Sequence, residues 1–335
     1  LQATSGAMDY HLKRGSRSQF HFTGQAGLNG IDLAVEGPLG QRWSYIANYS
    51  DSTVGLLSQL GVDFSDEKIL YQDLALQLSF YQNDRTTWQF FAIAGDNSNT
   101  FKASADNLRE EYKDFFNIDF KSQIGIAGGN VQTKFSDFLS WNTTFIASTR
   151  WDQREQSSPY LPSSYSDDYI ALTKYALNSE FTHELDEYWK LHYGINATLW
   201  SGVLEYENEN ISDLQTKFST TSLIFRPYLQ SQWQVNKWEF SGAIGLSYSE
   251  LTTQSHLEPK LAIIRHLPNQ QKLAMNSGIQ HKLQPYQVLL SSMKNAELPM
   301  MQSWKSTLTY EKNFRHSTLK STLFYEELTH VAAGH

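Results

Sequence analysis

Hydrophobic and polar residues alternate over residues 238–248 of the chain. One face of this stretch is mostly apolar and begins and ends with an aromatic ring, whereas the other face is small or polar. Successive side chains of a β-strand point to opposite faces, so the pattern predicts an amphipathic strand. Ten residues at about 3.3 Å each, tilted by roughly 40°, climb about 25 Å, which is the height of the apolar band on a membrane β-barrel.

The same alternation recurs along the chain and predicts about 15 strands. The first two form a hairpin within residues 16–39, joined by Asn29-Gly30, a pair that favours tight β-turns. Short and long connections alternate between the later strands, as in a barrel with turns at one end and loops at the other. The predicted fold is therefore all-β, a transmembrane antiparallel up-and-down β-barrel. The later strands are predicted at 43–52, 69–82, 87–97, 115–133, 139–152, 168–183, 188–206, 218–235, 237–250, 256–267, 271–283, 301–313 and 317–327.

Tryptophan placement supports this fold. Six tryptophans lie on the apolar face next to a short connection: Trp43, Trp88, Trp141, Trp189, Trp233 and Trp238. Trp151 and Trp304 lie on the apolar face near the loop end. Membrane barrels carry an aromatic girdle at each interface, so these residues are predicted to form the two girdles. The core aromatics of a soluble sandwich would not be sorted by strand end.

Composition narrows the classes of function. The 335 residues have a mean hydropathy of −0.48 and no apolar run long enough for a transmembrane helix, but barrel strands need only one apolar face. The net charge of −8 argues against nucleic acid as a partner. The absence of cysteine excludes disulfides, thiol nucleophiles and Cys-ligated metals. The 14% aromatic content suits a membrane barrel and also a carbohydrate-binding sandwich.

Motifs for catalysis or metal binding are missing from the sequence. It contains no HExxH, GxSxG, GxxxxGK or GxGxxG, and its ten histidines show no ligand-like spacing. We therefore expect no catalytic residue, no cofactor and no resident metal, although a hydrolase site assembled from distant residues stays open. The acidic loop with Glu207, Glu209 and Asp213 has oxygen ligands that suit Ca²⁺, but a solvated loop is the favoured interpretation.

The strand count predicts an incomplete barrel. Bacterial single-chain barrels have an even number of strands, and an open sheet edge is not tolerated in lipid. An odd count of about 15 therefore predicts further strands beyond this chain. The sequence also begins without the basic and apolar regions of a signal peptide, so we expect its natural start to lie upstream.

Several segments resemble a known family. SGAMDYHLKRG (5–15), FTGQAGLNGIDLAVEGPLG (22–40) and WSYIANYSDSTVGLL (43–57) resemble the junction between plug and barrel in TonB-dependent outer-membrane receptors of the Bacteroidota type. YQDLALQLSF (71–80) resembles the next strand of that family. HLEPKLAIIRHLPNQQKLAMNSGIQHKLQPYQVLL (256–290) resembles its mid-barrel hairpin, and LPMMQSWKSTLTYEKNF (298–314) the strand that follows.

The resemblance implies a 22-stranded barrel with an N-terminal plug. It assigns residues 1–15 to the end of the plug and residues 16–335 to the N-terminal two-thirds of the barrel. The implied function is import of a scarce nutrient such as a siderophore, oligosaccharide, peptide or cobalamin. The implied partners are outer-membrane lipid, the TonB-ExbB-ExbD complex and a surface lipoprotein, with no nucleic acid. The sequence lacks a plug body and the motif that contacts TonB.

Ligand contacts are expected from the loops and from the loop-side ends of polar-face positions. By parity these include Arg150, Asp152, Trp200, Tyr206 and Arg226. Trp200 is the one tryptophan on the polar face, and its ring is interpreted either as a stacking platform for a ligand or as packing against the plug. Three other functions stay open: a non-energised porin-like channel, an outer-membrane barrel hydrolase and a soluble β-sandwich that binds glycans.

Overall fold

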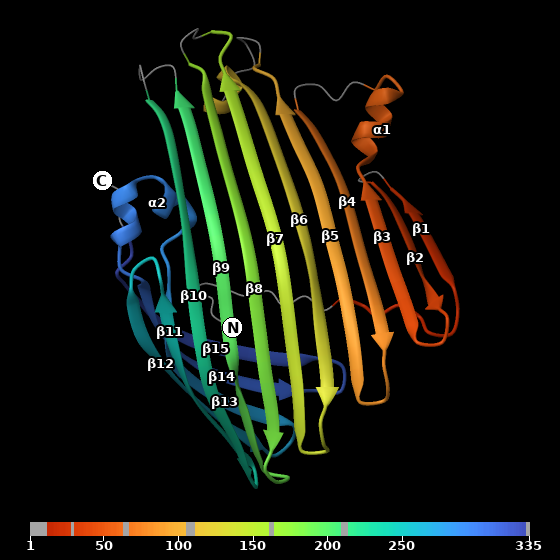
Figure 1. The fold of residues 1–335 in the computed structure, drawn as a ribbon, viewed down its shortest axis with the longest axis vertical. Coiled ribbons are helices and arrows are strands. Elements are labelled where there is room, and N and C mark those ends of the chain that lie inside the picture. Colours follow the sequence, from red (N-terminus) through yellow and green to blue (C-terminus); the bar gives the residue numbers. More distant parts are fainter. Residues whose placement is uncertain are drawn as a thin grey trace.

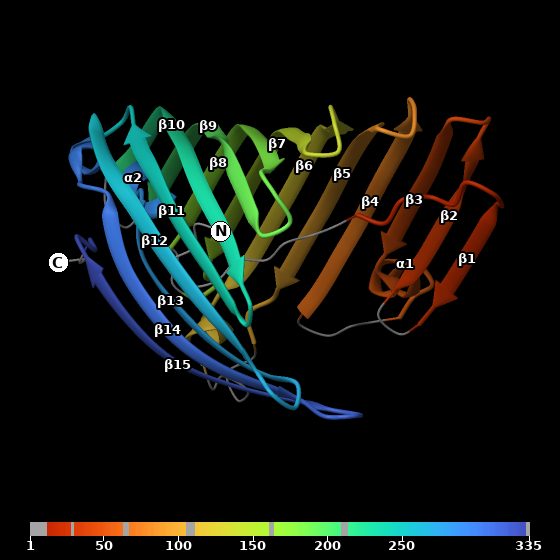
Figure 2. The same cartoon turned by 90° about the horizontal axis from the view of Figure 1, so that it is seen from below.

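A computed structural model of the chain describes residues 12–27, 30–62, 67–104, 111–160, 164–208 and 214–332. They form a single antiparallel sheet of 15 strands, in which every strand pairs with its neighbours in the sequence (Figure 1). The sheet curls so strongly that β11–β15 bend round toward the face of β6–β10 (Figure 2). The predicted antiparallel up-and-down sheet is confirmed, and among the described residues β1 and β15 form its two open edges.

The elements alternate short turns with longer loops. The strands are β1 (His21–Ala26), β2 (Ile31–Leu39), β3 (Trp43–Asp51), β4 (Glu67–Tyr81), β5 (Thr86–Phe101), β6 (Asn117–Lys134), β7 (Leu139–Ser157), β8 (Ser166–Glu184), β9 (Trp189–Asn208), β10 (Leu214–Val235), β11 (Trp238–Ser249), β12 (Gln254–Leu267), β13 (Gln271–Lys282), β14 (Met301–Asn313) and β15 (Thr318–Thr329). The helices are α1 (Thr53–Gln59), η2 (Tyr112–Phe115), α2 (Tyr286–Leu290) and η3 (Met293–Glu297).

The predicted strands are confirmed, but several reach further into the loops than expected. β7 ends at Ser157 instead of residue 152, and β10 begins at Leu214 instead of residue 218. The predicted strand ends were placed where the alternation of apolar residues ends. Their polar ends remain paired because backbone hydrogen bonds of the ladder hold them, as in the pairing of Asn117 with Ser157.

The first hairpin has a turn that differs by one position from the prediction. Ala26 pairs with Ile31, and the Gly27 N–H donates to the Gly30 carbonyl (2.9 Å). Gly30 therefore flanks the turn, whereas the sequence predicted it at the turn centre; the other half of the predicted pair, Asn29, lies outside the described residues. The predicted shared apolar face is confirmed, because Phe22 pairs with Val35.

The strand register sorts side chains onto two faces. The convex face includes the row Leu74, Ala94, Gly125, Thr149, Thr173 and Ser201, whose members pair from strand to strand. Trp200 has the opposite parity and lies on the concave face, where α2 packs against it. Among the described residues only nine hydrophobic side chains are buried. Four of them pack together in one cluster: Trp200, Leu283, Leu289 and Met300.

None of the described helices is both long enough and apolar enough to cross a bilayer.

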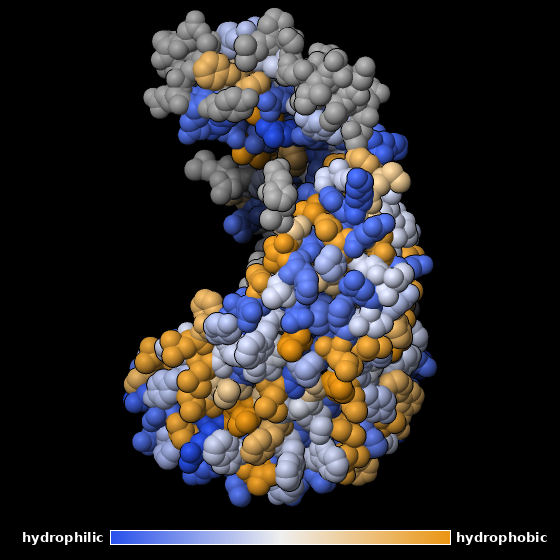
Figure 3. Space-filling view, turned by 90° about the vertical axis from the view of Figure 1, so that its left-hand side faces the viewer, coloured by the Kyte–Doolittle hydropathy of each residue, from blue (hydrophilic) through white to orange (hydrophobic). Residues whose placement is uncertain are grey.

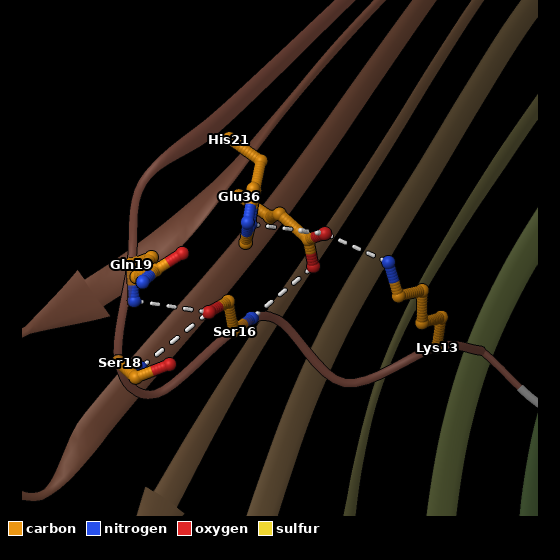
Figure 4. A network of polar contacts seen from close by, with 6 residues as sticks. All are labelled: Lys13, Ser16, Ser18, Gln19, His21 and Glu36. Atoms are coloured by element: carbon orange, nitrogen blue, oxygen red, sulfur yellow. Dashed lines mark hydrogen bonds and ion pairs between the residues drawn. The ribbon is translucent and has the colours of Figure 1, made fainter.

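The segment that precedes β1 runs along the concave face near the short turns (Figure 2). Glu36 of β2 accepts hydrogen bonds from Lys13 Nζ (2.7 Å) and from the backbone N–H of Ser16 (3.1 Å) (Figure 4). Arg14 donates to the Gln132 side chain of β6 (3.1 Å). A Cβ at Gly15 would meet the Tyr45 carbonyl oxygen at 1.9 Å, so only glycine allows this approach to β3. Of the segment assigned to the plug, residues 1–11 lie outside the described residues.

Gly194 provides a test of the strand packing. A Cβ at this position of β9 would lie 2.1 Å from the Ser179 carbonyl oxygen of β8, so Gly194→Ala must push the two strands apart. We expect this substitution to lower the free energy of unfolding by about 1–3 kcal/mol. The matched control is Gly242→Ala on β11, where no atom lies within 4 Å and the change should stay within about 0.5 kcal/mol. Thermal unfolding in detergent micelles measures both, and equal stability of the two variants would contradict the packing argument.

Candidate functional site

The concave face is the candidate site, and the segment between β13 and β14 covers part of it. This segment, residues 283–300, carries α2 and η3 and folds against β9 and β10 (Figure 1). The Tyr286 ring lies 5.0 Å from the ring of Trp200, and Lys174 of β8 places its ammonium 4.6 Å from the centre of the Tyr286 ring. Burial of apolar rings and a cation–π contact therefore hold α2 on the wall.

A glycine in β9 allows α2 to come this close. A Cβ at Gly202 would lie 3.0 Å from a Leu290 methyl carbon and 3.1 Å from a Leu172 methyl carbon. Leu290 itself is 1% exposed. The small residue thus leaves a socket that the Leu290 side chain fills, and the tight packing stabilises the position of residues 283–300.

Trp200 lies on the concave face, as its parity predicted, but its ring is not accessible. It is 1% exposed, and Leu283, Leu289 and Met300 pack around it. The interpretation as an open stacking platform for a ligand therefore does not hold in this structure. The ring does pack against another part of the protein, but that part is the segment 283–300 of the same chain. Sequence reasoning missed this because the burial depends on where a loop folds.

Arg226 belongs to a buried polar cluster below α2. Its guanidinium donates to Ser247 Oγ (2.9 Å) and to the His281 carbonyl (3.2 Å). The Glu258 carboxylate accepts from the His281 N–H (2.7 Å). The ladder between β12 and β13 ends at the pair Lys260–Gly278, so Glu258 and Arg226 satisfy backbone groups of His281 that the diverging strands leave unpaired.

Two histidines complete this cluster. The rings of His256 and His281 stack at 4.1 Å, and His281 Nε2 lies 3.3 Å from the Gln302 side-chain oxygen. Glu258 and His281 are almost fully buried, at 4% and 5% exposed. Parity alone could have placed His256 and Glu258 on the concave face. Parity would assign His281 to the convex face. That assignment fails because the alternation of side chains within one strand contains no information about where β12 and β13 diverge.

Arg150 and Asp152 lie together, apart from Arg226. They form an ion pair on β7 (2.9 Å), and Asp152 also accepts from Ser122 Oγ (2.5 Å). By register Arg150 is level with Gly202, whereas Arg226 pairs with Asn196, six residues further from the loops along β9. The sequence-predicted residues therefore fall into two levels of the concave face.

Tyr206 belongs to the upper of these levels, nearer the loops. It pairs with Asp168 of β8, and Asp168 pairs with Arg154 of β7. Charged and hydrogen-bonding side chains therefore reach the loop end of the concave face on three neighbouring strands. The acidic loop proposed for Ca²⁺ is different, because Glu209 and Asp213 lie outside the described residues. Within the part of the chain that the structure describes, no group of three His, Asp or Glu could hold a metal ion.

The convex face carries aromatic side chains in two rows, one near the short turns and one near the loops. Near the short turns, Trp43 stacks on Phe80 (4.6 Å), Trp141 on Phe181 (6.1 Å) and Trp238 on Phe240 (6.1 Å). Trp88, Trp189 and Trp233 lie in the same belt and are 37%, 44% and 56% exposed. Near the loops, the rings of Trp151 and Tyr169 lie 6.3 Å apart, and those of Trp304 and Tyr325 lie 5.8 Å apart.

Between the two belts the convex face is apolar and exposed. Figure 3 shows apolar residues spread over the lower part of the wall, seen from the side of β10–β13. The exposed members there include Leu229, Ile244, Leu257 and Leu261. Exposed apolar side chains that gather on one face mark contact with a membrane or another protein.

Comparison with known proteins gives matches in structure alone. No family model matches the chain, and no curated protein sequence matches it. Its structure resembles a mutant of the ferric enterobactin receptor PfeA from Pseudomonas aeruginosa, with a TM-score of 0.66 and 14% identity over 92% of this chain and 52% of that chain. It also resembles the unliganded ferric citrate transporter FecA (TM-score 0.66, 11% identity, 89% of this chain and 48% of that one). The copper transporter OprC gives a TM-score of 0.65 at 11% identity, over 94% and 55% of the two chains.

These likenesses establish the fold. The chain has the architecture of the outer-membrane receptor barrels, and it spans about half the length of the receptors that it matches.

Replacing Trp200 tests whether the wall holds the segment 283–300. Trp200→Ala removes the ring around which Leu289 and Met300 pack, so we expect the variant to lose about 3–5 kcal/mol of stability locally. Amide hydrogen exchange of residues 283–300 should then rise strongly. Trp304→Ala, which removes an exposed ring on the convex face, is the control and should leave that exchange unchanged. Unchanged exchange in both variants would show that α2 is held by other contacts.

Proposed function

We propose that this chain is the barrel wall of a TonB-dependent outer-membrane receptor that imports a scarce nutrient. The observation that carries the proposal is the convex face, on which exposed apolar side chains lie between two aromatic belts. Exposing this surface to water would be unfavourable, because each Å² of apolar area in contact with water costs about 25 cal/mol of free energy. In a bilayer it is the surface that the hydrocarbon requires.

The polar character of the concave face supports our proposal that this face lines the lumen of the barrel. It carries the Arg150–Asp152 pair, the Arg226 cluster and a hydrogen bond from the Tyr228 hydroxyl to Glu180 (2.5 Å). A soluble sandwich would bury apolar side chains on this face instead. The apolar-out, polar-in arrangement therefore disfavours the glycan-binding sandwich and favours a membrane barrel.

The closed barrel in our proposal has 22 strands. The open edges at β1 and β15 and the length of the structural neighbours support about seven further strands that close it. We propose that residues 1–15 are the end of a plug and that residues 16–335 are the N-terminal two-thirds of the barrel, of the Bacteroidota type that the sequence resembles. The Lys13–Glu36 pair and the fit of Gly15 against β3 support a segment that enters from the concave side.

The same segment separates the energised receptor from its rivals. In an energised receptor the TonB-ExbB-ExbD complex acts on a plug, and residues 12–20 would connect that plug to the concave wall. A non-energised porin-like channel needs no such plug. The barrel hydrolase has no specific support among the described residues. We propose that the nutrient is captured at the loop end, where Arg150, Asp152 and Tyr206 lie, with Arg226 lining the path below. Among the possible nutrients we favour siderophores, because two of the structural neighbours are named as a ferric enterobactin receptor and a ferric citrate transporter.

The membrane location is tested by a pair of neighbouring substitutions. Leu229 faces outward and is 46% exposed, whereas Gln230 faces the concave side and hydrogen-bonds to Ser241. We expect Leu229→Arg to destabilise the barrel by about 2–4 kcal/mol because it places a charge in hydrocarbon. Gln230→Lys should be tolerated. The measurement is the folded fraction in membranes that have been washed with salt and alkali and then extracted with detergent. Release of the unmodified protein by the alkaline wash would refute the membrane proposal.

The transport role is tested by uptake of iron chelates into cells. We expect uptake of ferric enterobactin or ferric citrate to require the TonB complex, and Arg150→Ala to weaken binding by roughly 10- to 150-fold, in line with the loss of one charge-assisted contact of about 1.5–3 kcal/mol. Lys121→Ala, on the convex face of β6, is the matched control and should bind normally. Uptake that persists without the TonB complex would favour the porin-like channel. Normal binding by both variants would show that the ligand does not contact Arg150.

A further inference from the structure

The concave face of β10–β13 contains a polar trough. Two adjoining cavities, of about 380 and 320 Å³, share Gln230, Ser241 and Ala262. Each volume is within the range of small-molecule sites, about 300–1,000 Å³. Lys260 lines the upper end of the trough, and Glu239 lines its lower end next to the short turns. The trough therefore leads from the buried polar cluster below α2 to the turn end of the lumen.

The register explains why this part of the wall is hollow. One row of concave-face residues across β10–β14 reads Gln230, Ala243, Lys260, Gly278 and Lys305. The next row toward the turns reads Gln232, Ser241, Ala262, Asn276 and Thr307. Most of these side chains are small, and a Cβ at Gly278 would lie 2.8 Å from Lys260 Cγ. The glycine thus makes room for the Lys260 side chain over β13.

The charge and hydrogen-bonding groups of the trough suit an anion. The Lys305 ammonium lies 3.8 Å from the Glu326 carboxylate, which also accepts a hydrogen bond from Ser303 Oγ (2.7 Å). Lys260 has no ion-pair partner among the described residues. Amide side chains continue the concave face of β10 toward the turns, at Gln230, Gln232 and Gln234. Ammonium groups attract a negative charge, and amide N–H groups donate to the oxygens of the same molecule.

The concave face of β5–β7 has a different character. Ile93 pairs with Ile126, and Gly128 pairs with Phe91 on one side and with Ile146 on the other. Moving a charged molecule over such a surface is unfavourable, because it exchanges water for apolar contacts. This part of the wall suits packing against another part of the protein.

The N-terminal segment is held on the same side of the lumen as these apolar residues. Besides its contacts with β2 and β3, Arg14 donates to Gln132 of β6, and the Arg17 guanidinium lies 4.1 Å from the centre of the Tyr81 ring of β4. In the proposed receptor this segment is the end of the plug. The plug is then anchored to the wall of β2–β7, and the trough lies on the other side of the curled sheet (Figure 2).

We propose that the trough is the route by which an anionic, oxygen-rich cargo leaves the lumen. The cargo passes from the Arg226 cluster to Lys260 and Lys305, and then along the glutamines of β10, between the plug and the wall of β10–β13. Each hydrogen bond that it loses is replaced by the next, so movement costs little free energy. The carboxylate of Glu239 at the turn end repels the anion and favours its release. The inference rests on the proposed import function.

The test uses the absence of cysteine from this chain, because a single introduced thiol can be modified selectively. Ser241→Cys places that thiol in the trough of the full-length receptor in cells. The variant should import ferric citrate or ferric enterobactin normally until a bulky methanethiosulfonate reagent is added. The reagent should then block uptake, and dithiothreitol should restore it. Binding of the chelate at the cell surface should not change.

The matched control is Asn142→Cys on the concave face of β7. Asn142 pairs with Gln132, where the N-terminal segment is held. Its modification should leave uptake unchanged. If Ser241→Cys does not fold, Ala262→Cys places the thiol in the same trough from β12. Equal loss of uptake at the two walls, or a loss at Asn142→Cys alone, would overturn the inference.

The charge of the cargo is tested by a double variant, Lys260→Met with Lys305→Met. It should lower the maximal rate of uptake roughly tenfold, through the loss of charge-assisted contacts, while the affinity at the cell surface stays the same. An unchanged rate would overturn the anionic route. Uptake that does not need the TonB complex, or release of the protein by alkaline washing, would instead overturn the proposed function, so the two failures are distinguishable.

Discussion

Backbone pairing is the constraint on which this structure depends. In hydrocarbon no water can satisfy an N–H or a carbonyl, so a wall that crosses a bilayer must pair these groups from strand to strand. The 15 strands do so in sequence order, and the register of each pair then determines which side chains face outward. Leu74, Gly125 and Thr149 share a row because hydrogen bonds align them, although they are distant in the sequence.

The ladder is interrupted where β12 and β13 diverge, and charged side chains take its place. Glu258 and Arg226 bind the N–H and the carbonyl of His281, which would otherwise be buried without partners. Burying charges is expensive unless they are hydrogen-bonded, and here each one is. The cluster therefore has a structural role as well as a place on the path that we propose for the nutrient.

Small residues at chosen positions shape both faces of the wall. Gly202 opens a socket for Leu290 on the concave face, and Gly15 lets the N-terminal segment lie against β3. Gly125 does the opposite on the convex face, because it leaves space that no side chain of the described chain fills. The first two glycines serve contacts within the protein, whereas the third leaves the surface open to what surrounds it.

The sequence by itself determined the strands, their order and the two faces. Alternation with period two is a local property, so Trp238, Phe240 and Ile244 could be assigned to one face without any coordinates. The sorting of tryptophans by strand end also follows from local spacing. Turn position was less certain, as Gly30 shows, because a one-residue shift leaves the apolar pattern almost unchanged.

Only the tertiary structure decided which of these side chains are accessible. The burial of Trp200 depends on the fold of residues 283–300, and the burial of His281 depends on the divergence of two strands. The trough below the Arg226 cluster depends on how five strands align side by side. These are contacts between segments far apart in the sequence, and alternation within one strand carries no information about its neighbour's register or about the place where a loop comes to rest.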